Sequence, residues 1–361
     1  MQGCNRRSAL KMGVTAVIAF SGCGWFEDDE GVPPVVPTAE ALPTAQVESL
    51  ELRLKVGDRF PLRKTVTQEL HQASAIGPAI SHTQLELLLT LTVEEVLPDR
   101  KRLGVRYNRV KYSQDLAGDK FEIDSSRLDQ DPPPAALPYL GLVDNGFSFW
   151  IGRDNQIIEP VGFPEFLERC VRAVPQAERK EVLKRFAQST ADEGVANFVD
   201  DSIGLLPYEV DGKSQGTNVA EGDTWTRERR LMQPMPLYLN NRYTLRSLTP
   251  KLAEIDILGK VTPAATPKDA DDGVVQASMK STPDVMVRGG NAFGTCTIDR
   301  TTGLPLESKV ERYLEMNVRL PNGLAFEQRK RTVTTIQAFP QQPAAVSQKD
   351  AVSEKESGTA Q

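Results

Sequence analysis

The sequence predicts a mainly β protein of the α+β class, built from antiparallel β-meanders around a central helical insertion. Apolar and polar residues alternate over two long stretches, and Gly, Pro, Asn and Asp residues punctuate them. Helical spacing is confined to the middle of the chain. Strands with one apolar and one polar face are typical of antiparallel sheet.

The first 22 residues have the order of a bacterial export signal. Arg6, Arg7 and Lys11 form a basic start, and residues 12–20 form an apolar run. A bilayer span takes roughly 20 apolar residues, so this run fits a signal peptide better than a transmembrane helix. The two arginines also fit a twin-arginine signal, and both export routes stay open.

The tetrad Phe20-Ser21-Gly22-Cys23 resembles a lipobox, in which the cysteine thiol receives a diacylglyceryl group. We expect cleavage of residues 1–22 and anchoring through acyl chains on Cys23, where each buried CH₂ contributes about 0.8 kcal/mol. Ordinary signal cleavage and an uncleaved anchor are the alternatives. The predicted location is the cell-envelope membrane, facing the periplasm or exposed at the surface.

Composition divides the rest of the chain into five parts. Residues 23–45 are rich in proline and predict an extended tether, and residues 340–361 are polar and predict a disordered tail. Between them we expect a first β-rich part (46–161), a helical insertion (162–206) and a second β-rich part (207–339).

Charge and cysteine content limit the partners and the cross-links. The net charge is -6, and loss of the basic signal makes the chain more acidic, so nucleic-acid binding is not expected. Cys4 leaves with the signal, and Cys170 and Cys296 remain. An oxidising compartment permits a disulfide between these two, with buried unpaired thiols as the alternative.

Alternation is clearest near the start and the end of the β-rich region. The apolar positions are Leu85, Leu87, Leu89, Leu91 and Val93, and later Leu306, Val310, Leu314, Met316, Val318 and Leu320. Charged residues take most of the positions between them. Residues 98–101 and Pro321-Asn322-Gly323 predict tight turns, because these residue types favour turn conformations.

The central insertion has helical signals. Residues 165–174 and 176–188 predict two helices separated by Pro175. Thr190 and Glu193 form a capping box for a third helix, which Gly204 ends.

The two β-rich parts open alike, with Val56-Gly57-Asp58 in the first and Glu221-Gly222-Asp223 in the second. Each predicts a Gly-Asp turn followed by a strand. This suggests a duplicated meander, although Gly-Asp is also a common turn dipeptide.

Several strand and turn segments together resemble a family of uncharacterised secreted bacterial lipoproteins that carry a domain of unknown function. They are Val56-Gly57-Asp58, residues 91–96 with 103–107, residues 149–151 with 157–162, and residues 294–299 with 302–308. The resemblance implies a lipid-anchored, β-rich envelope protein. It implies no catalytic residues, because none is established for the family.

No motif predicts catalytic or cofactor chemistry. His71 and His82 are the two histidines, and a metal site would need a third ligand, so no metal is expected. The glycine-rich residues 288–294 lack the Gly-Lys-Ser/Thr end of a phosphate loop, and no Gly-x-Ser-x-Gly elbow occurs. We therefore lean against an enzyme and expect no cofactor.

Five aromatic residues could line a concave sheet, or belong to a packed core: Phe147, Phe149, Trp150, Trp225 and Tyr243. A curved sheet capped by helices resembles the half-barrel of carriers in the outer-membrane lipoprotein-sorting system, which implies an apolar cavity for acyl chains.

The expected function is that of a lipid-anchored envelope protein with a non-enzymatic structural or binding role. The first alternative is a carrier of lipid or another hydrophobic ligand, and the second is an envelope hydrolase that uses carboxylates. The expected partners are the membrane, through the anchor, and an unidentified protein or lipid.

Overall fold

The computed structural model describes residues 47–74, 77–116, 118–127, 132–190, 202–208, 216–231, 235–263 and 284–339. The predicted signal peptide, Cys23, the tether, the capping box after Thr190 and the tail lie outside these residues. Residues 45–361 form one compact unit, to which all of the described structure belongs.

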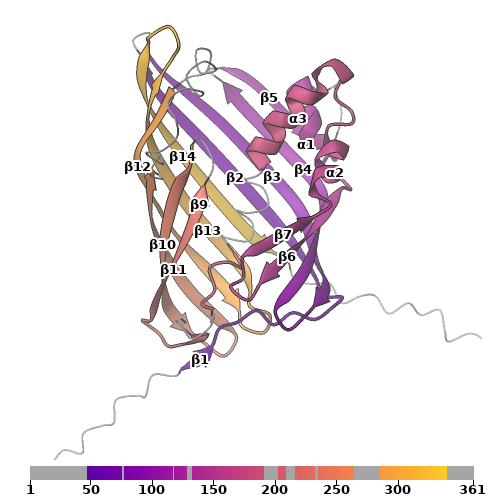
Figure 1. The fold of residues 1–361 in the computed structure, drawn as a ribbon, viewed down its shortest axis with the longest axis vertical. Coiled ribbons are helices and arrows are strands. Elements are labelled where there is room, and N and C mark those ends of the chain that lie inside the picture. The colour runs from indigo at the N-terminus through magenta and orange to yellow at the C-terminus, as the bar shows by residue number, and fades with distance from the viewer. Residues whose placement is uncertain are drawn as a thin grey trace, which may run out of the picture. The chain divides into compact units, whose positions relative to one another are not determined.

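The predicted fold class is confirmed, because the described part of the chain is dominated by one antiparallel sheet of 12 strands (Figure 1). The strand order is β7-β6-β4-β3-β2-β14-β13-β12-β11-β10-β9, and β5 pairs with β4. The strands are β2 (Arg59–Ser74), β3 (Gly77–Val96), β4 (Arg100–Leu116), β5 (Asp119–Asp124), β6 (Gly146–Gly152), β7 (Ile157–Val161), β9 (Thr224–Leu231), β10 (Leu237–Leu248), β11 (Leu252–Pro263), β12 (Asp284–Asp299), β13 (Leu304–Arg319) and β14 (Ala325–Ala338).

The two β-rich parts predicted from the sequence are halves of this one sheet. Strand β14, from the second part, pairs with β2, from the first, and the register runs from Glu327 opposite Ala73 to Ala338 opposite Leu62. The first and last long strands therefore meet in the middle of the sheet, which the local alternation of residues does not reveal.

The sheet curves around one of its faces. A single cluster of buried side chains includes Phe147 of β6 and Trp225 of β9, although these strands lie near opposite ends of the strand order. Arg227 of β9 donates a hydrogen bond to the carbonyl of Asp154, in the β6–β7 turn. The two sheet ends thus approach each other, and the enclosed face is called the concave face below (Figure 1).

Residues 50–54, called the strap below, cover one rim of the sheet. Leu50, Leu52 and Leu54 are buried in the main core, as the spacing of two residues allows in an extended segment. The strap follows β1 (Glu48–Ser49), which pairs with β8 (Asn218–Val219). The strap also hydrogen-bonds to the turn before β13, through Arg53 N–H and Thr302 O at 2.8 Å.

The two Gly-Asp turns share one hydrogen-bond pattern. Asp58 Oδ2 accepts from Lys55 N–H at 2.9 Å, and Asp223 Oδ2 accepts from Ala220 N–H at 2.8 Å. Gly57 and Gly222 have φ angles of 91° and 90°, in the region that favours glycine. Each turn also exchanges two backbone hydrogen bonds with one residue of a neighbouring strand, Val93 of β3 for the first turn and Leu245 of β10 for the second. The resemblance seen in the sequence therefore extends to the geometry of the turns.

The described helices are few and lie beside the β4–β6 part of the sheet (Figure 1). They are the 3₁₀ turn η1 (Pro134–Ala136), α1 (Leu137–Leu140), α2 (Phe163–Cys170) and α3 (Gln176–Thr190). The two helices predicted on either side of Pro175 are thereby confirmed, with α2 ending earlier than expected. In the part of the chain that the structure describes, no helix is both long and apolar enough to span a bilayer.

The disulfide that the sequence allowed is not formed. Cys170 ends α2, whereas Cys296 lies in β12, opposite Ile255 and Ser308 on the neighbouring strands. Both thiols are buried and free, and both belong to the main core cluster. Burial raises the pKa of the Cys170 thiol to about 12, so this group stays protonated.

Candidate functional site

The concave face carries charges of one sign. Away from the strand ends, each charged side chain that the described strands place on this face is a cation. Burial of cations is costly unless other groups compensate the charge, and each of these makes further contacts within the protein. The set, called the concave cations below, is Lys64, Arg227, Arg229, Arg312 and Lys330.

One register row crosses the sheet through this set. It passes from Arg227 through Asn241, Gly259 and Ala292 to Arg312, and then to Thr332 and Gln68. The Asn241 amide is 8% exposed, and its Nδ2 donates to Tyr243 Oη at 3.0 Å. Its Oδ1 has no hydrogen-bond partner among the described residues, so the row holds a buried acceptor that a ligand could satisfy.

An apolar patch lies beside this row on strands β9 to β13. In the next register row, the patch residues Leu239, Val261 and Leu314 lie between two half-buried cations, Arg229 at one end and Lys330 at the other. This region of the face is therefore amphiphilic, with cations at the margins of an apolar cluster whose side chains are 5% exposed or less. The patch comprises Leu231, Leu237, Leu239, Val261, Val287, Ala292, Leu314 and Met316.

The convex face has a different charge pattern, with cations paired to carboxylates. Arg331 Nε donates to Glu311 Oε1 at 2.6 Å and to Tyr313 Oη at 3.0 Å, and Arg331 Nη1 lies 3.3 Å from Glu69 Oε2. The hydrogen bond from Arg331 holds the pKa of the Glu311 carboxyl below its usual value. The convex network thus stabilises the charged forms of Glu311 and Arg331.

The two histidines lie on the convex face and approach the same carboxylate. His71 Nε2 and His82 Nδ1 are each 3.9 Å from a Glu69 oxygen. No group of three or more His, Cys, Asp or Glu side chains that could hold a metal ion occurs among the described residues.

The predicted aromatic lining is divided between the two faces. Phe147, Phe149, Trp225 and Tyr243 lie in the main core, where Trp225 Nε1 donates to Leu205 O at 2.7 Å. Trp150 points to the convex face, beneath the Arg100 guanidinium at 4.4 Å from the ring centroid. Four of the five residues therefore belong to one core cluster, and Trp150 lies apart from them on the other face.

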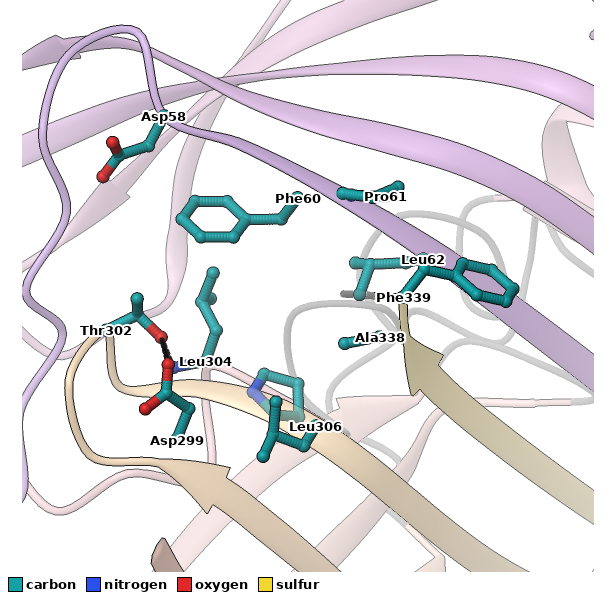
Figure 2. Close-up of a pocket in the computed structure, with 11 residues that line it drawn as sticks. Asp58, Phe60, Pro61, Leu62, Asp299, Thr302, Leu304, Leu306, Ala338 and Phe339 are labelled. Atoms are coloured by element: carbon teal, nitrogen blue, oxygen red, sulfur yellow. Dashed lines mark hydrogen bonds between the residues drawn. The ribbon is translucent and has the colours of Figure 1, made fainter. Parts of the chain in front are cut away.

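A small pocket opens at the rim where β14 ends, and it is called the rim slot below (Figure 2). Its volume is about 320 Å³, at the lower end of the range for small-molecule sites. Most of its walls are apolar, and its polar side chains are Asp58, Asp299 and Thr302. The apolar lining consists of Phe60, Pro61, Leu62, Leu304, Pro305, Leu306, Ala338 and Phe339.

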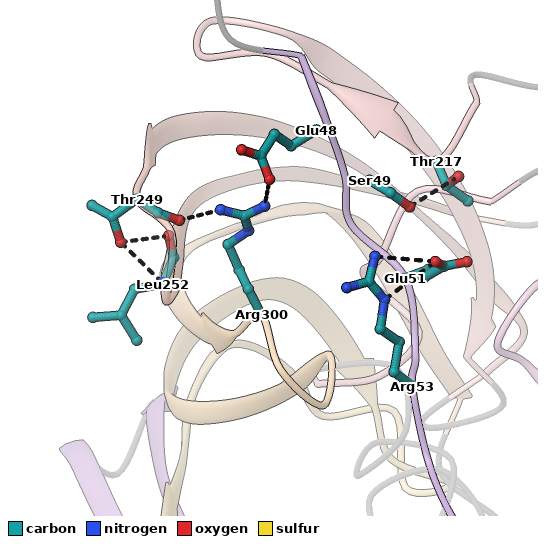
Figure 3. A network of polar contacts seen from close by, with 8 residues as sticks. All are labelled: Glu48, Ser49, Glu51, Arg53, Thr217, Thr249, Leu252 and Arg300. Carbon is teal, nitrogen blue, oxygen red and sulfur yellow. Dashed lines mark hydrogen bonds and ion pairs between the residues drawn. The ribbon is translucent and has the colours of Figure 1, made fainter.

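The same rim is held by a polar network (Figure 3). Arg300, whose side chain is 9% exposed, pairs with Glu48 of β1 and donates to the Thr249 carbonyl. Ser49 Oγ and Thr217 Oγ1 add a 3.5 Å contact between β1 and the residue before β8. These contacts fix β1, which precedes the strap, to Arg300 and to Thr217, and Arg300 in turn holds the carbonyl of Thr249. A structural role is the simplest account of this network.

The shifted carboxyl groups do not resemble a general acid. The hydrogen bonds of Lys120 and Arg109 lower the pKa values of Asp115 and Asp124, as Arg331 lowers that of Glu311. A general acid that works near neutral pH needs a raised pKa. These three groups are instead members of ion pairs.

The concave cations and Asn241 are absent from the residues predicted as a site. The sequence did contain a signal for them: Lys64 lies between Leu62 and Val66, and Arg312 between Val310 and Leu314, so each occupies an apolar phase of its strand. Leu306 is the opposite case, because it continues an apolar pattern yet is 41% exposed and lines the rim slot.

Solved structures with weak similarity include outer-membrane proteins. OccK5 (OpdH) of Pseudomonas aeruginosa is 7% identical, with 78% of this chain and 99% of that chain covered, at a TM-score of 0.19. The COG4313 outer membrane channel of Pseudomonas putida F1 is 8% identical, with coverages of 80% and 97% and a TM-score of 0.19. Similarity at these TM-scores carries no argument about fold or function.

A search of curated proteins gave no match. The family of unknown function (DUF6263) matches residues 99–305, from the turn before β4 to the start of β13. This segment is more than half of the chain and includes the described helices and strands β9 to β12, which carry all of the apolar patch except Leu314 and Met316. The chain therefore belongs to the family of unknown function DUF6263.

Proposed function

We propose that this chain is a lipid-anchored envelope protein that binds an amphiphilic acid on the concave face of its sheet. The observation that carries the proposal is the sign of the buried charge: the concave face has cations beside an apolar patch, in a chain whose net charge is -6. The role is one of binding, without chemical change of the ligand.

The cations favour an acidic headgroup. Arg and Lys form charge-assisted hydrogen bonds with carboxylate, phosphate and sulfate groups, and these bonds are about twice as strong as neutral ones. Arg227 and Arg312 lie in the same register row as the unsatisfied Asn241 Oδ1. Because each cation already has contacts in the protein, the headgroup would join or exchange those contacts rather than meet an uncompensated charge.

The patch favours an apolar chain on the same ligand. Leu239, Val261 and Leu314 lie in one register row between Arg229 and Lys330, with Gly290 between Val261 and Leu314. These three side chains are 4% exposed or less, so an acyl or alkyl chain would reach them by replacing the groups that now cover them. Apolar contact contributes about 25 cal/mol per Å² of buried surface and would add affinity to the headgroup contacts. The ligand would thus lie beside the apolar patch and not against the core aromatics.

The membrane location rests on the sequence, through the lipobox-like residues around Cys23. A lipid anchor would keep the protein at a surface where amphiphilic acids are concentrated. An envelope location, rather than a cytoplasmic one, is part of the proposal and can be tested separately by labelling with radioactive palmitate in wild-type and Cys23→Ser cells.

The ligand proposal is tested by titration with decanoate and decylamine, which share a chain length and differ in the sign of the headgroup. The full chain carries Cys23→Ser, so that no attached lipid competes. Lys330→Gln removes a concave cation, and Arg329→Gln removes the neighbouring convex cation as the matched control. Thermal unfolding of each variant verifies that it is folded.

We expect decanoate to bind more tightly than decylamine, and Lys330→Gln to weaken decanoate about tenfold, the value of one charge-assisted contact of about 1.4 kcal/mol. Arg329→Gln should leave both affinities unchanged. Equal binding of the two probes, or equal effects of the two variants, would contradict the acid specificity. Repetition with decyl phosphate separates a carboxylate preference from a general preference for acids.

A further inference from the structure

The rim slot exists because one strand is shorter than its two neighbours. The last pair of β14 with β2 is Ala338 opposite Leu62, and its last pair with β13 is Gln337 opposite Glu307. Strand β13 continues to Leu304, and β2 continues to Arg59. Phe339 N–H still donates to Pro61 O at 3.0 Å, and β2 and β13 extend beyond this point. Because neighbouring strands lie about 4.8 Å apart, the described residues leave a gap one strand wide, about 10 Å, between β2 and β13 there.

The two ends of the slot differ in chemistry, as Figure 2 shows. Leu62, Ala338 and Phe339 lie at one end, and Asp58, Asp299 and Thr302 lie at the other. The lining residues include no cation. A ligand that fits both ends therefore has a short apolar body and a cationic, hydrogen-bond-donating group.

The carboxylates are fixed by the turns that carry them. Asp299 Oδ1 accepts from Thr301 N–H at 2.9 Å, and Asp299 Oδ2 accepts from Thr302 Oγ1 at 3.0 Å. Asp58 Oδ2 accepts from Lys55 N–H at 2.9 Å. Each carboxylate keeps lone pairs for a further donor, because a carboxylate has about four acceptor sites. The acceptors are thus in place before a ligand arrives, which lowers the ordering cost of binding.

The second Gly-Asp turn shows that the turn alone does not make a site. Asp223 has the same bond to the backbone as Asp58, but its side chain is exposed and lines no pocket described here. What distinguishes Asp58 is the gap beside it and the apolar walls of Phe60 and Leu304. The Asp223 turn is therefore a control, within the same chain, for the contribution of the gap to ligand binding at Asp58.

We infer that the rim slot is a binding site for a short apolar primary amine, whose ammonium group lies at the end of the slot that carries Asp58 and Asp299 and whose hydrocarbon part lies between β2 and β13. This inference is independent of the proposed binding of an amphiphilic acid, which uses the opposite sign of charge and a different part of the sheet.

The test uses hexylamine, with hexanol and hexanoate as neutral and anionic probes of the same length, and follows binding to the full chain by saturation-transfer NMR and calorimetric titration. Asp58→Asn removes the charge but keeps the acceptor that the turn needs, and Asp223→Asn makes the same change in the equivalent turn. Ala338→Met fills the apolar end of the slot from β14.

We expect hexylamine to bind and hexanoate not to bind. Asp58→Asn should weaken hexylamine about tenfold through loss of a charge-assisted bond, and Asp223→Asn should have no effect. Ala338→Met should reduce hexylamine binding and leave decanoate binding unchanged.

Three results would overturn the inference: no saturation transfer to hexylamine, equal affinity for hexanol, or equal effects of the two Asp→Asn variants. If Asp58→Asn or Ala338→Met lowers the unfolding midpoint, the comparison of hexylamine with hexanoate on the unsubstituted chain still tests whether the protein prefers the amine. Loss of decanoate binding with hexylamine binding intact would refute the proposed function alone.

Discussion

The concave and convex faces of the sheet are built from the same strands but treat charge in opposite ways. On β14, Lys330 points to the concave face and its neighbour Arg331 to the convex face. Arg331 bonds to Glu311 and lies near Glu69, whereas away from the strand ends the described strands place cations but no carboxylate around Lys330. The difference shows that alternation decides which face a residue occupies and leaves its electrostatic role undetermined.

Surface ion pairs explain the convex face without a function. Pairs such as Arg331 with Glu311 balance the charges of the convex face within the protein itself. On the enclosed face the described strands instead collect charges of one sign, and each of these cations makes further contacts within the protein that compensate the cost of burial. This contrast is the reason for placing the ligand on the concave face.

The largest expected effect compares the same substitution on the two faces. Phe149 is 1% exposed in the concave core, and Phe293 is 43% exposed on the convex face, stacked on Tyr313. We expect Phe149→Ala to lower the free energy of unfolding by about 3–5 kcal/mol. Phe293→Ala should lower it by about 1 kcal/mol.

Urea unfolding of both variants measures the difference. Similar losses of unfolding free energy in the two variants would show that the main core does not lie on the concave face. The unsubstituted chain, unfolded under the same conditions, supplies the reference.

A smaller effect is expected for Asn241, which separates stability from binding. Asn241→Leu removes a buried acceptor that has no partner among the described residues, and it also removes the bond to Tyr243. The two changes oppose each other, so the free energy of unfolding should change by less than about 1 kcal/mol. Decanoate binding should nevertheless fall, because a ligand contact is lost.

Asn240→Leu, on the convex side of the same strand, is the control and should leave decanoate binding intact. Asn241 would lose its place in the proposed site if Asn241→Leu bound decanoate as well as the unsubstituted chain does.

The smallest effect concerns acid stability. Arg331 lowers the pKa of Glu311 in the folded protein, so this carboxylate stabilises the fold above its unfolded pKa of about 4.3. That contribution is lost as the pH falls through the lower, folded pKa. Arg331→Gln raises the folded pKa again, and the variant should lose less stability on acidification than the unsubstituted chain.

Thermal midpoints from neutral pH down to about pH 3, a range that spans the unfolded pKa, check this. Arg329→Gln is the control, because Arg329 lies 3.7 Å from Glu315 in an exposed pair. If the thermal midpoint of Arg331→Gln fell more steeply with decreasing pH than that of the unsubstituted chain, the convex network would not be what keeps Glu311 ionised.

Much of the fold could be predicted from the sequence, because local patterns determine strands and turns. The alternation at Leu87, Leu89 and Leu91 marks the concave face of β3, and the Gly57 and Gly222 turns form as expected. The pairing of β14 with β2 could not be predicted, because it joins residues more than 250 positions apart and leaves no local signal.

The site was less predictable for the same reason. Arg227, Asn241 and Arg312 belong to strands that are separate in the sequence and meet in one row only through the sheet register. From the sequence, five aromatic residues could line a concave sheet. Large apolar side chains are equally suited to a core, and four of the five pack in the main core. The rim slot depends on the length of β14 relative to its neighbours, which no motif encodes.

The most direct test of the central claim is native mass spectrometry of the full chain, extracted gently from the cell envelope. The account predicts an additional mass from a bound acidic amphiphile, which disappears on delipidation and is reduced in Lys330→Gln but retained in Arg329→Gln. A bare mass in all three proteins, or a bound lipid that is neutral or cationic, would contradict it.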